Sequence, residues 1–191
     1  MLIREVILEN FMSYEYARIP LKEGVNVVCG PNGSGKSSLL LGICVALGDT
    51  YTERSKKLSD LIRWGHDTAR VTLTLDNKIG ENGYRPVPQY NMDEISLTRN
   101  LRVDGKYGFR LNQRNVSKAE VVELLRTYGF DPNNMLIIMH QAMPSRFANI
   151  NPKERLEILE EAVGFETFRR DVIEAKSKLS GVLSEEQSLG N

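Results

Sequence analysis

Residues 30–38 read Gly30-Pro31-Asn32-Gly33-Ser34-Gly35-Lys36-Ser37-Ser38. The spacing of one glycine, four residues and then Gly-Lys-Ser is that of a P-loop, a motif that needs a strand before it and a helix after it. An apolar run at 25–29 and a helix-like run at 38–47 supply this context. We therefore predict an α/β fold, with strands over 2–9 and 19–29 ahead of the loop.

The predicted loop has the residues of a phosphate cradle. Gly33 and Gly35 lack a Cβ, so the backbone can curl until successive N–H groups point at one anion. Lys36 adds a flexible positive charge for the β- and γ-phosphates, and the Ser37 hydroxyl can bind Mg²⁺. The loop residues expected to contact ATP are Asn32, Gly33, Ser34, Gly35, Lys36, Ser37 and Ser38. The alternative is a plain glycine-rich turn, which the flanking patterns disfavour.

The composition is that of an ordinary globular protein. Of the 191 residues, 41% are apolar and 26% are charged, and 25 basic residues balance 25 acidic ones. Net charge therefore favours no class of partner. Charged residues occur too close to the N-terminus for a signal peptide, and the longest apolar run, 39–48, is too short to cross a bilayer. We expect a cytoplasmic protein that does not enter a membrane.

The middle of the chain alternates between apolar and polar residues, as antiparallel strands do. The alternation is strict over 70–76 and returns over 95–111, where Asp104-Gly105 is a hairpin signal. A β meander is therefore expected. Ser117 and Glu120 then form a capping box, which predicts a helix that starts directly after it.

The predicted hairpin is also basic. Between positions 99 and 118 there is one acidic residue, and the six basic residues are Arg99, Arg102, Lys106, Arg110, Arg114 and Lys118. With Tyr107 and Phe109 among them, these side chains could contact the backbone of DNA. A solvated outer face of the sheet explains the same pattern equally well, so both interpretations stay open.

Two helices are predicted toward the C-terminal end. Asn151 suits an N-cap and Pro152 suits the first helical turn. From Phe165 onward, apolar residues recur at alternating steps of three and four, which predicts a coiled-coil seam of about three heptads. Before these helices, a buried strand over 135–139 would place Gln141 at its C-terminal end.

The order of these motifs resembles the N-terminal half of the ATPase head of the structural maintenance of chromosomes (SMC) family and its recombination-repair relatives. The resemblance covers nearly the whole chain. It is carried by the Asn10-x-Met12-Ser13 bend, the P-loop, Val-Thr-Leu-Thr-Leu-Asp-Asn at 71–77, Ile-Ser-Leu-Thr-Arg at 95–99, Gln141, Asn-Pro-Lys-Glu-Arg-Leu-Glu at 151–157 and Glu-Glu-Ala-x-Gly at 160–164. Each motif is weak alone, and their joint order is specific.

The resemblance implies a fold, ligands and a location. The fold is the α/β P-loop ABC-type ATPase head, with a mixed sheet, an antiparallel β lobe and the base of a coiled coil. Residues 1–164 would form the N-terminal lobe of the head, and residues 165–191 would start the coiled-coil arm. The ligands would be ATP and Mg²⁺, in a cytoplasmic, chromosome-associated protein. Archaeal SMC-like proteins are among the subfamilies that fit.

Several residues receive roles only through the resemblance. Gln141 resembles the Q-loop glutamine that binds Mg²⁺ together with Ser37. Arg54 stands where SMC heads place an arginine near the α-phosphate, although a shorter loop leaves Lys56 and Lys57 as alternatives. Lys36, Gln141 and Arg54 would thus be the catalytic residues. The residues that resemble adenine-side contacts are Met12, Ser13, Arg63 and Trp64.

Two motifs of a complete head are absent from the sequence. No run of four apolar residues precedes Asp-Glu, as a Walker B motif requires, and Leu-Ser-Gly-Val at 179–182 lacks the second glycine of a signature motif. In the family both motifs belong to a C-terminal half. We therefore expect half of a head, which hydrolyses ATP only when the other half completes it and two heads engage.

The expected partners are the C-terminal half of the same head, a second head joined through an ATP sandwich and a hinge, DNA, and accessory subunits. The alternative function is the nucleotide-binding subunit of an ABC transporter. Such a subunit would carry the signature and Walker B motifs in one compact chain, without heptads after the Q-loop. A P-loop kinase or GTPase would need an acceptor site or an Asn-Lys-x-Asp motif, and the sequence has neither.

Overall fold

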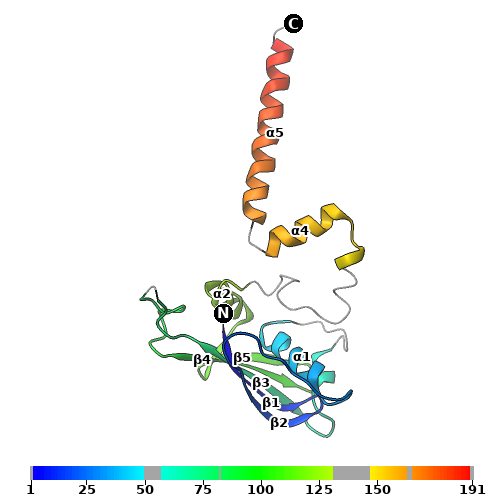
Figure 1. The fold of residues 1–191 in the computed structure, drawn as a ribbon, viewed down its shortest axis with the longest axis vertical. Helices are drawn as coiled ribbons and strands as arrows, with labels where there is room; N and C mark the ends of the chain where they lie inside the picture. Colours follow the sequence, from blue (N-terminus) through cyan, green and yellow to red (C-terminus); the bar gives the residue numbers. More distant parts are fainter. Residues whose placement is uncertain (1, 50–56, 82, 131–146, 163–164, 190–191) are drawn as a thin grey trace. The chain divides into compact units, whose positions relative to one another are not determined.

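The computed structural model describes residues 2–49, 57–81, 83–130, 147–162 and 165–189 (Figure 1). These residues belong to two compact units, 1–132 and 133–191. The first unit contains a sheet with the P-loop helix against it, and the described part of the second is helical. None of the helices in the described part of the chain is both long and apolar enough to cross a membrane.

The sheet of the first unit has six strands, and every pair of neighbours is antiparallel. In chain order the strands are β1 (Ile3–Phe11), β2 (Tyr14–Pro20), β3 (Thr68–Asp76), β4 (Glu94–Arg102), β5 (Tyr107–Leu111) and β6 (Arg114–Val116). They lie in the order β2-β1-β3-β4-β5-β6. The expected meander is confirmed. The predicted strand over 135–139 lies outside the described residues.

One face of the sheet forms the core with helix α1 (Lys36–Ala46). Figure 1 shows α1 lying across the central strands, and the helix contacts β1, β3 and β4. A Cβ on Gly42 would lie 2.7 Å from Cδ2 of Leu8, so the missing side chain lets the helix approach the sheet closely. The fully buried apolar residues of the sheet are Val6, Leu8, Phe11, Val71, Leu73, Leu75, Ile95 and Leu97.

The second predicted strand is only partly present. Strand β2 ends at Pro20, and residues 25–30 are neither strand nor helix. In this run Val25, Val27 and Val28 are 93%, 78% and 49% exposed. An extended run becomes a strand only when a neighbour satisfies its N–H and C=O groups, and no described segment pairs with it. The prediction of a strand over 19–29 is therefore wrong beyond Pro20.

The capping box and its helix are confirmed in α2 (Lys118–Thr127). The Glu120 N–H donates to Ser117 Oγ at 3.2 Å, and the Ser117 N–H donates to Glu120 Oε2 at 2.7 Å. Just upstream lies β6, which the sequence analysis did not predict. Strand β6 has three residues, too few for an alternating pattern. The turn before it, Asn112-Gln113, has positive φ at both residues, as two-residue hairpin turns require.

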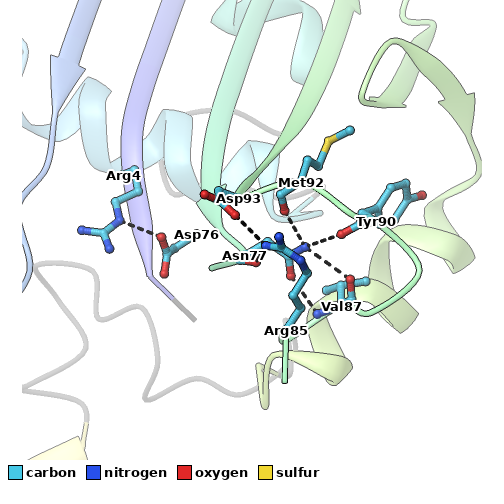
Figure 2. A network of polar contacts seen from close by, with 8 residues as sticks. All are labelled: Arg4, Asp76, Asn77, Arg85, Val87, Tyr90, Met92 and Asp93. Carbon is cyan, nitrogen blue, oxygen red and sulfur yellow. Dashed lines mark hydrogen bonds and ion pairs between the residues drawn. The ribbon is translucent and has the colours of Figure 1, made fainter. Parts of the chain in front are cut away.

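In the connection between β3 and β4, Asn77 makes hydrogen bonds to several described loop residues, as Figure 2 shows. The Asn77 side chain is fully buried. Its Nδ2 donates to the carbonyl oxygens of Tyr90 at 2.9 Å and Met92 at 3.0 Å, and its Oδ1 accepts from the Val87 N–H at 2.8 Å. One side chain thereby satisfies backbone groups along much of the loop. Arg4 of β1 pairs with Asp76 at 3.0 Å beside it.

The second unit contains α4 (Pro152–Ala162) and α5 (Glu166–Leu189). The predicted N-cap is confirmed, because the Glu154 N–H donates to Asn151 Oδ1 at 2.9 Å. Arg169 of α5 pairs with Glu160 of α4, which joins the two helices. Apolar residues of the predicted seam are exposed among the described residues, with Phe168 at 66% and Leu179 at 60%.

Candidate nucleotide-binding site

The P-loop has the backbone conformation that its glycines were predicted to permit. Gly33 has φ 83° and Gly35 has φ 96°, values in the left-handed region that favours glycine. No atom lies within 4 Å of where a Cβ of Gly33 would stand. The loop therefore presents open backbone at Gly33, which is what close approach of a phosphate requires.

The N-terminus of α1 follows the loop directly. Gly35 is the N-cap residue, and no side chain makes a capping hydrogen bond there. The N–H groups of the first turn are thus not taken by a side-chain cap, and the helix adds partial positive charge at the same place. This arrangement fits a polyphosphate anion.

Lys36 lies folded over the loop that precedes it. Its Nζ donates to the carbonyl oxygens of Gly30 and Pro31, each at 2.7 Å. An ammonium group has three donors, so one N–H remains beyond these two bonds. Ser37 is exposed, whereas the Ser38 side chain is only 4% exposed. Lys36 and Ser37 thus lie at the loop, and Ser38 faces the core.

The turn between β1 and β2 contacts the P-loop. A Cβ on Gly35 would lie 2.8 Å from the Tyr14 hydroxyl oxygen and 3.0 Å from Ser13 Oγ. The sequence predicts Ser13, but not Tyr14, as a site residue. The signal that could have found Tyr14 is its position next to Ser13, where β2 begins. Two residues far from the P-loop in the sequence therefore line it.

Three of the four expected adenine-side residues lie together. Arg63 Nη1 donates to the Ser13 carbonyl oxygen at 2.7 Å, and the Met12 N–H donates to the Leu61 carbonyl oxygen at 2.8 Å. The fourth, Trp64, follows Arg63 in the chain and is 95% exposed. With the Gly35 contact, these residues form one surface that runs from the P-loop to the β1–β2 turn. Their contact with a base stays a prediction.

The remaining catalytic predictions fall on other segments. Arg54, Lys56 and Gln141 lie outside the described residues. Lys57, the remaining alternative for the arginine role, is exposed at the N-cap of the short 3-10 helix η1 (Leu58–Leu61). The roles of these four residues stay predictions.

Arg99 corrects one of the predicted DNA contacts. It is 0% exposed, because the alternation of β4 puts it on the same face of the sheet as Leu97 and Leu101. Its Nη1 donates to the carbonyl oxygens of Val45 and Asp49, each at 2.6 Å. Burial lowers the pKa of Arg99 to about 10, so the guanidinium stays charged at neutral pH. A buried side chain cannot touch a phosphate on the surface, and the expectation for Arg99 is wrong.

The other five basic residues that could contact DNA lie on the surface, including Lys118 at the start of α2. Arg102 and Lys106 are within 3.4 and 3.8 Å of the Asp104 carboxylate, and Arg114 is 2.9 Å from that of Glu120. Arg110 donates to the Asn115 side chain at 3.1 Å. Exposed pairs of this kind are weak and exchange readily with other anions. A role in binding DNA stays a prediction for these five residues.

Comparison with known proteins places the chain in a family. The model of the RecF/RecN/SMC N terminal domain matches residues 2–187. Structural maintenance of chromosomes protein 2 of Gallus gallus is 34% identical over 173 residues, which cover 86% of this chain and 14% of that protein. Chromosome partition protein Smc of Synechocystis sp. is 30% identical over 206 residues, which cover 97% of this chain and 17% of that protein. The chain thus spans less than a fifth of the length of these relatives.

Solved structures are similar over the same residues. A structure from work on ATP-driven dimerization and DNA-stimulated activation of SMC ATPases has a TM-score of 0.75 and 26% identity, covering 85% of this chain and 99% of that one. The Smc head domain with an extended coiled coil from Pyrococcus furiosus, bound to the C-terminal domain of ScpA, has a TM-score of 0.74 and 26% identity, covering 93% and 46%. The P-loop, the antiparallel sheet and the helices after it agree with these matches, and the chain belongs to the family of RecF/RecN/SMC N-terminal domains.

Proposed function

We propose that this chain is the ATP-binding N-terminal half of an SMC-type ATPase head that serves chromosome organisation or DNA repair. The observation that carries the proposal is the contact between the P-loop and the β1–β2 turn at Gly35 and Tyr14. It brings the phosphate cradle and the residues expected beside the adenine onto one surface. The family match supports the same function.

Different residues of the site bind different parts of the nucleotide. Backbone N–H groups of the loop and Lys36 bind the phosphates, with the exposed Asn32 and Ser34 at the mouth of the loop. Ser37 and Gln141 would hold Mg²⁺, which supplies positive charge to the β- and γ-phosphate oxygens when bound. Arg54, or Lys56 or Lys57 in its place, approaches the α-phosphate.

The C-terminal half of the head completes the site. The exposed apolar run at 25–29 supports this step, because it has the sequence pattern of a strand but no strand partner among the described residues, and it leads directly into the P-loop. A strand from the other half would pair with it and bury its valines. That half also supplies the Walker B and signature motifs, so hydrolysis needs both halves.

Two heads then engage across the nucleotide. Each ATP is held between one P-loop and the signature motif of the second head, so ATP binding favours dimerization by mass action. Residues 1–164 form the lobe of the head and residues 165–191 start the arm that leads to the hinge. The Pyrococcus furiosus Smc head is bound to a domain of ScpA, and we propose an accessory subunit of that kind here.

The transporter alternative is not favoured. The relatives named above are SMC proteins, and the matching family model is that of RecF, RecN and SMC. After the predicted Q-loop the chain continues into α5, a helix of 24 residues, where a transporter subunit would continue its compact domain. A stripe of exposed apolar residues on that helix suits a second helix of a coiled coil.

The proposal is tested by two experiments. Isothermal titration calorimetry with the chain alone measures its affinity for ATP, and ATPase assays with and without the C-terminal half measure turnover. We expect weak ATP binding by the chain alone, no turnover, and hydrolysis once the second half is added. Lys36→Ala should abolish binding, and the matched control Lys78→Ala, at an exposed lysine, should leave it unchanged. Robust turnover by the chain alone would contradict the half-head, and no binding by the unmutated chain would overturn the ATP site.

A further inference from the structure

Arg99 joins the end of the P-loop helix to the β4–β5 hairpin. The guanidinium carbon lies 4.6 Å from the ring centroid of Tyr107 and 4.7 Å from that of Phe109. Next to these two rings, which pack edge to face, Nη1 reaches the carbonyl oxygens of Val45, near the C-terminal end of α1, and of Asp49 just beyond it. One side chain therefore contacts two strands and the helix end at once.

The charge of Arg99 suits this place. The C-terminus of a helix carries partial negative charge and unpaired carbonyl groups, which a cation stabilises. Aromatic rings next to a guanidinium, here those of Tyr107 and Phe109, add to this attraction. Arg99 is nevertheless held incompletely, because its Nε and Nη2 are buried without a hydrogen-bond partner in the described part of the chain.

A residue that only filled the core would not need this chemistry. An apolar side chain of similar volume fills a buried site without the desolvation cost of a charge. What an arginine adds is direction, since Nη1 on its planar guanidinium holds two carbonyl oxygens relative to the strand that carries it. The feature that it fixes here is the helix that begins at the P-loop with Lys36 and Ser37.

We propose that Arg99 is a positioning residue for the ATP site, which it serves by fixing the far end of α1 to β4 and β5. Helix α1 has 11 residues, which makes it about 16 Å long at the usual rise per residue. It behaves as a rigid rod, so a shift at Val45 moves Lys36 and Ser37 against a bound phosphate. The inference rests on the proposed ATP-binding function.

The test compares Arg99→Met and Arg99→Lys with Arg70→Met in the head completed by its C-terminal half. Arg70 is the matched control, since it lies on the neighbouring strand β3, faces outward and forms an ordinary pair with Glu9 at 3.3 Å. The measurements are the Kd for ATP by titration, kcat and KM, and Tm by circular dichroism. We expect Arg99→Met to raise the Kd about tenfold or more, since small displacements at a site cost such factors. Arg99→Lys should recover part of the loss, and Arg70→Met should match the unmutated head.

The Kd is the deciding measurement because a merely structural role would lower Tm and leave the affinity of the folded protein unchanged. A folded Arg99→Met variant with unchanged Kd and kcat would overturn the inference. If that variant does not fold, Tyr107→Leu removes one ring and keeps the hydrogen bonds, and here a Kd raised severalfold supports the inference while an unchanged Kd overturns it. Failure of the unmutated head to bind ATP would instead overturn the proposed function, and this inference with it.

Discussion

The α-carbon of Gly35 lies against the side chain of Tyr14, so that a Cβ on Gly35 would stand 2.8 Å from the phenol oxygen. Tyr14 begins β2 and Gly35 caps α1. The contact therefore fixes the β1–β2 turn against the P-loop. Both the backbone angle and the space at this position exclude a side chain.

Gly35→Ala should weaken ATP binding by about tenfold or more. The change forces a Cβ into a left-handed conformation, at a cost of about 1–2 kcal/mol, and pushes the loop away from Tyr14 as well. Gly24→Ala is the control, because Gly24 has φ 89° with nothing within 4 Å of its Cβ position. Titration of ATP into each variant measures its Kd for ATP. Equal affinities for the two would show that the contact with Tyr14 does not matter.

Asn77→Ala should lower the free energy of unfolding of the first unit by about 3 kcal/mol. The substitution leaves the Val87 N–H and several loop carbonyls buried without a partner, and each such group costs about 1–3 kcal/mol. Urea denaturation measures the loss, and limited proteolysis should show new cleavage within 78–93. Asn100→Ala, on the half-buried outer side of β4, is the control and should stay within about 0.5 kcal/mol. A stable Asn77→Ala variant with an intact loop would refute the central role of this side chain.

Reversing the charges of Arg102, Lys106 and Arg110 should weaken DNA binding by the assembled protein. If all three contact phosphates, the slope of log K against log salt should fall by about 3. Arg18→Glu, at an exposed arginine of β2, is the control for the change of net charge. Fluorescence anisotropy over a range of salt concentrations measures the slope. Unchanged affinity at low salt would remove the hairpin from the DNA interface.

Short-range patterns predicted the local structure well. The P-loop glycines, the capping box of Ser117 and Glu120, and the N-cap at Asn151 each depend on residues within four positions of one another. Strands β3, β4 and β5 followed from strict alternation, because one face of an antiparallel sheet meets the core. These parts of the fold are determined by residues that lie close together in the sequence.

Arg99 shows where a local rule can mislead. A count of basic residues assigned it to the surface, although the alternation of Ile95, Leu97 and Leu101 already put position 99 on the inner face. The two-residue period of β4 was a better guide to the side of the sheet that Arg99 faces than the count of basic residues. What no pattern could supply is the partner, since Val45 and Asp49 lie 54 and 50 residues away in the chain.

The contacts that assemble the site are also long-range. Tyr14 meets Gly35, and Arg63 bonds to Ser13 from 50 residues away. The same limit explains the run at 25–29, whose sequence is that of a strand but whose ladder partner is not among the described residues. The sequence of a segment can favour extended structure, but a strand forms only when a neighbouring strand hydrogen-bonds to it.

The exposed valines just ahead of the P-loop have a practical consequence for making this protein. Val25 and Val27 are 93% and 78% exposed in a run that has the sequence of a strand but forms none among the described residues, and such segments pair readily with copies of themselves. Purified alone, the polypeptide should precipitate as its concentration rises. In the proposed head the C-terminal half covers these valines, so producing both halves in the same cells should keep the polypeptide in solution.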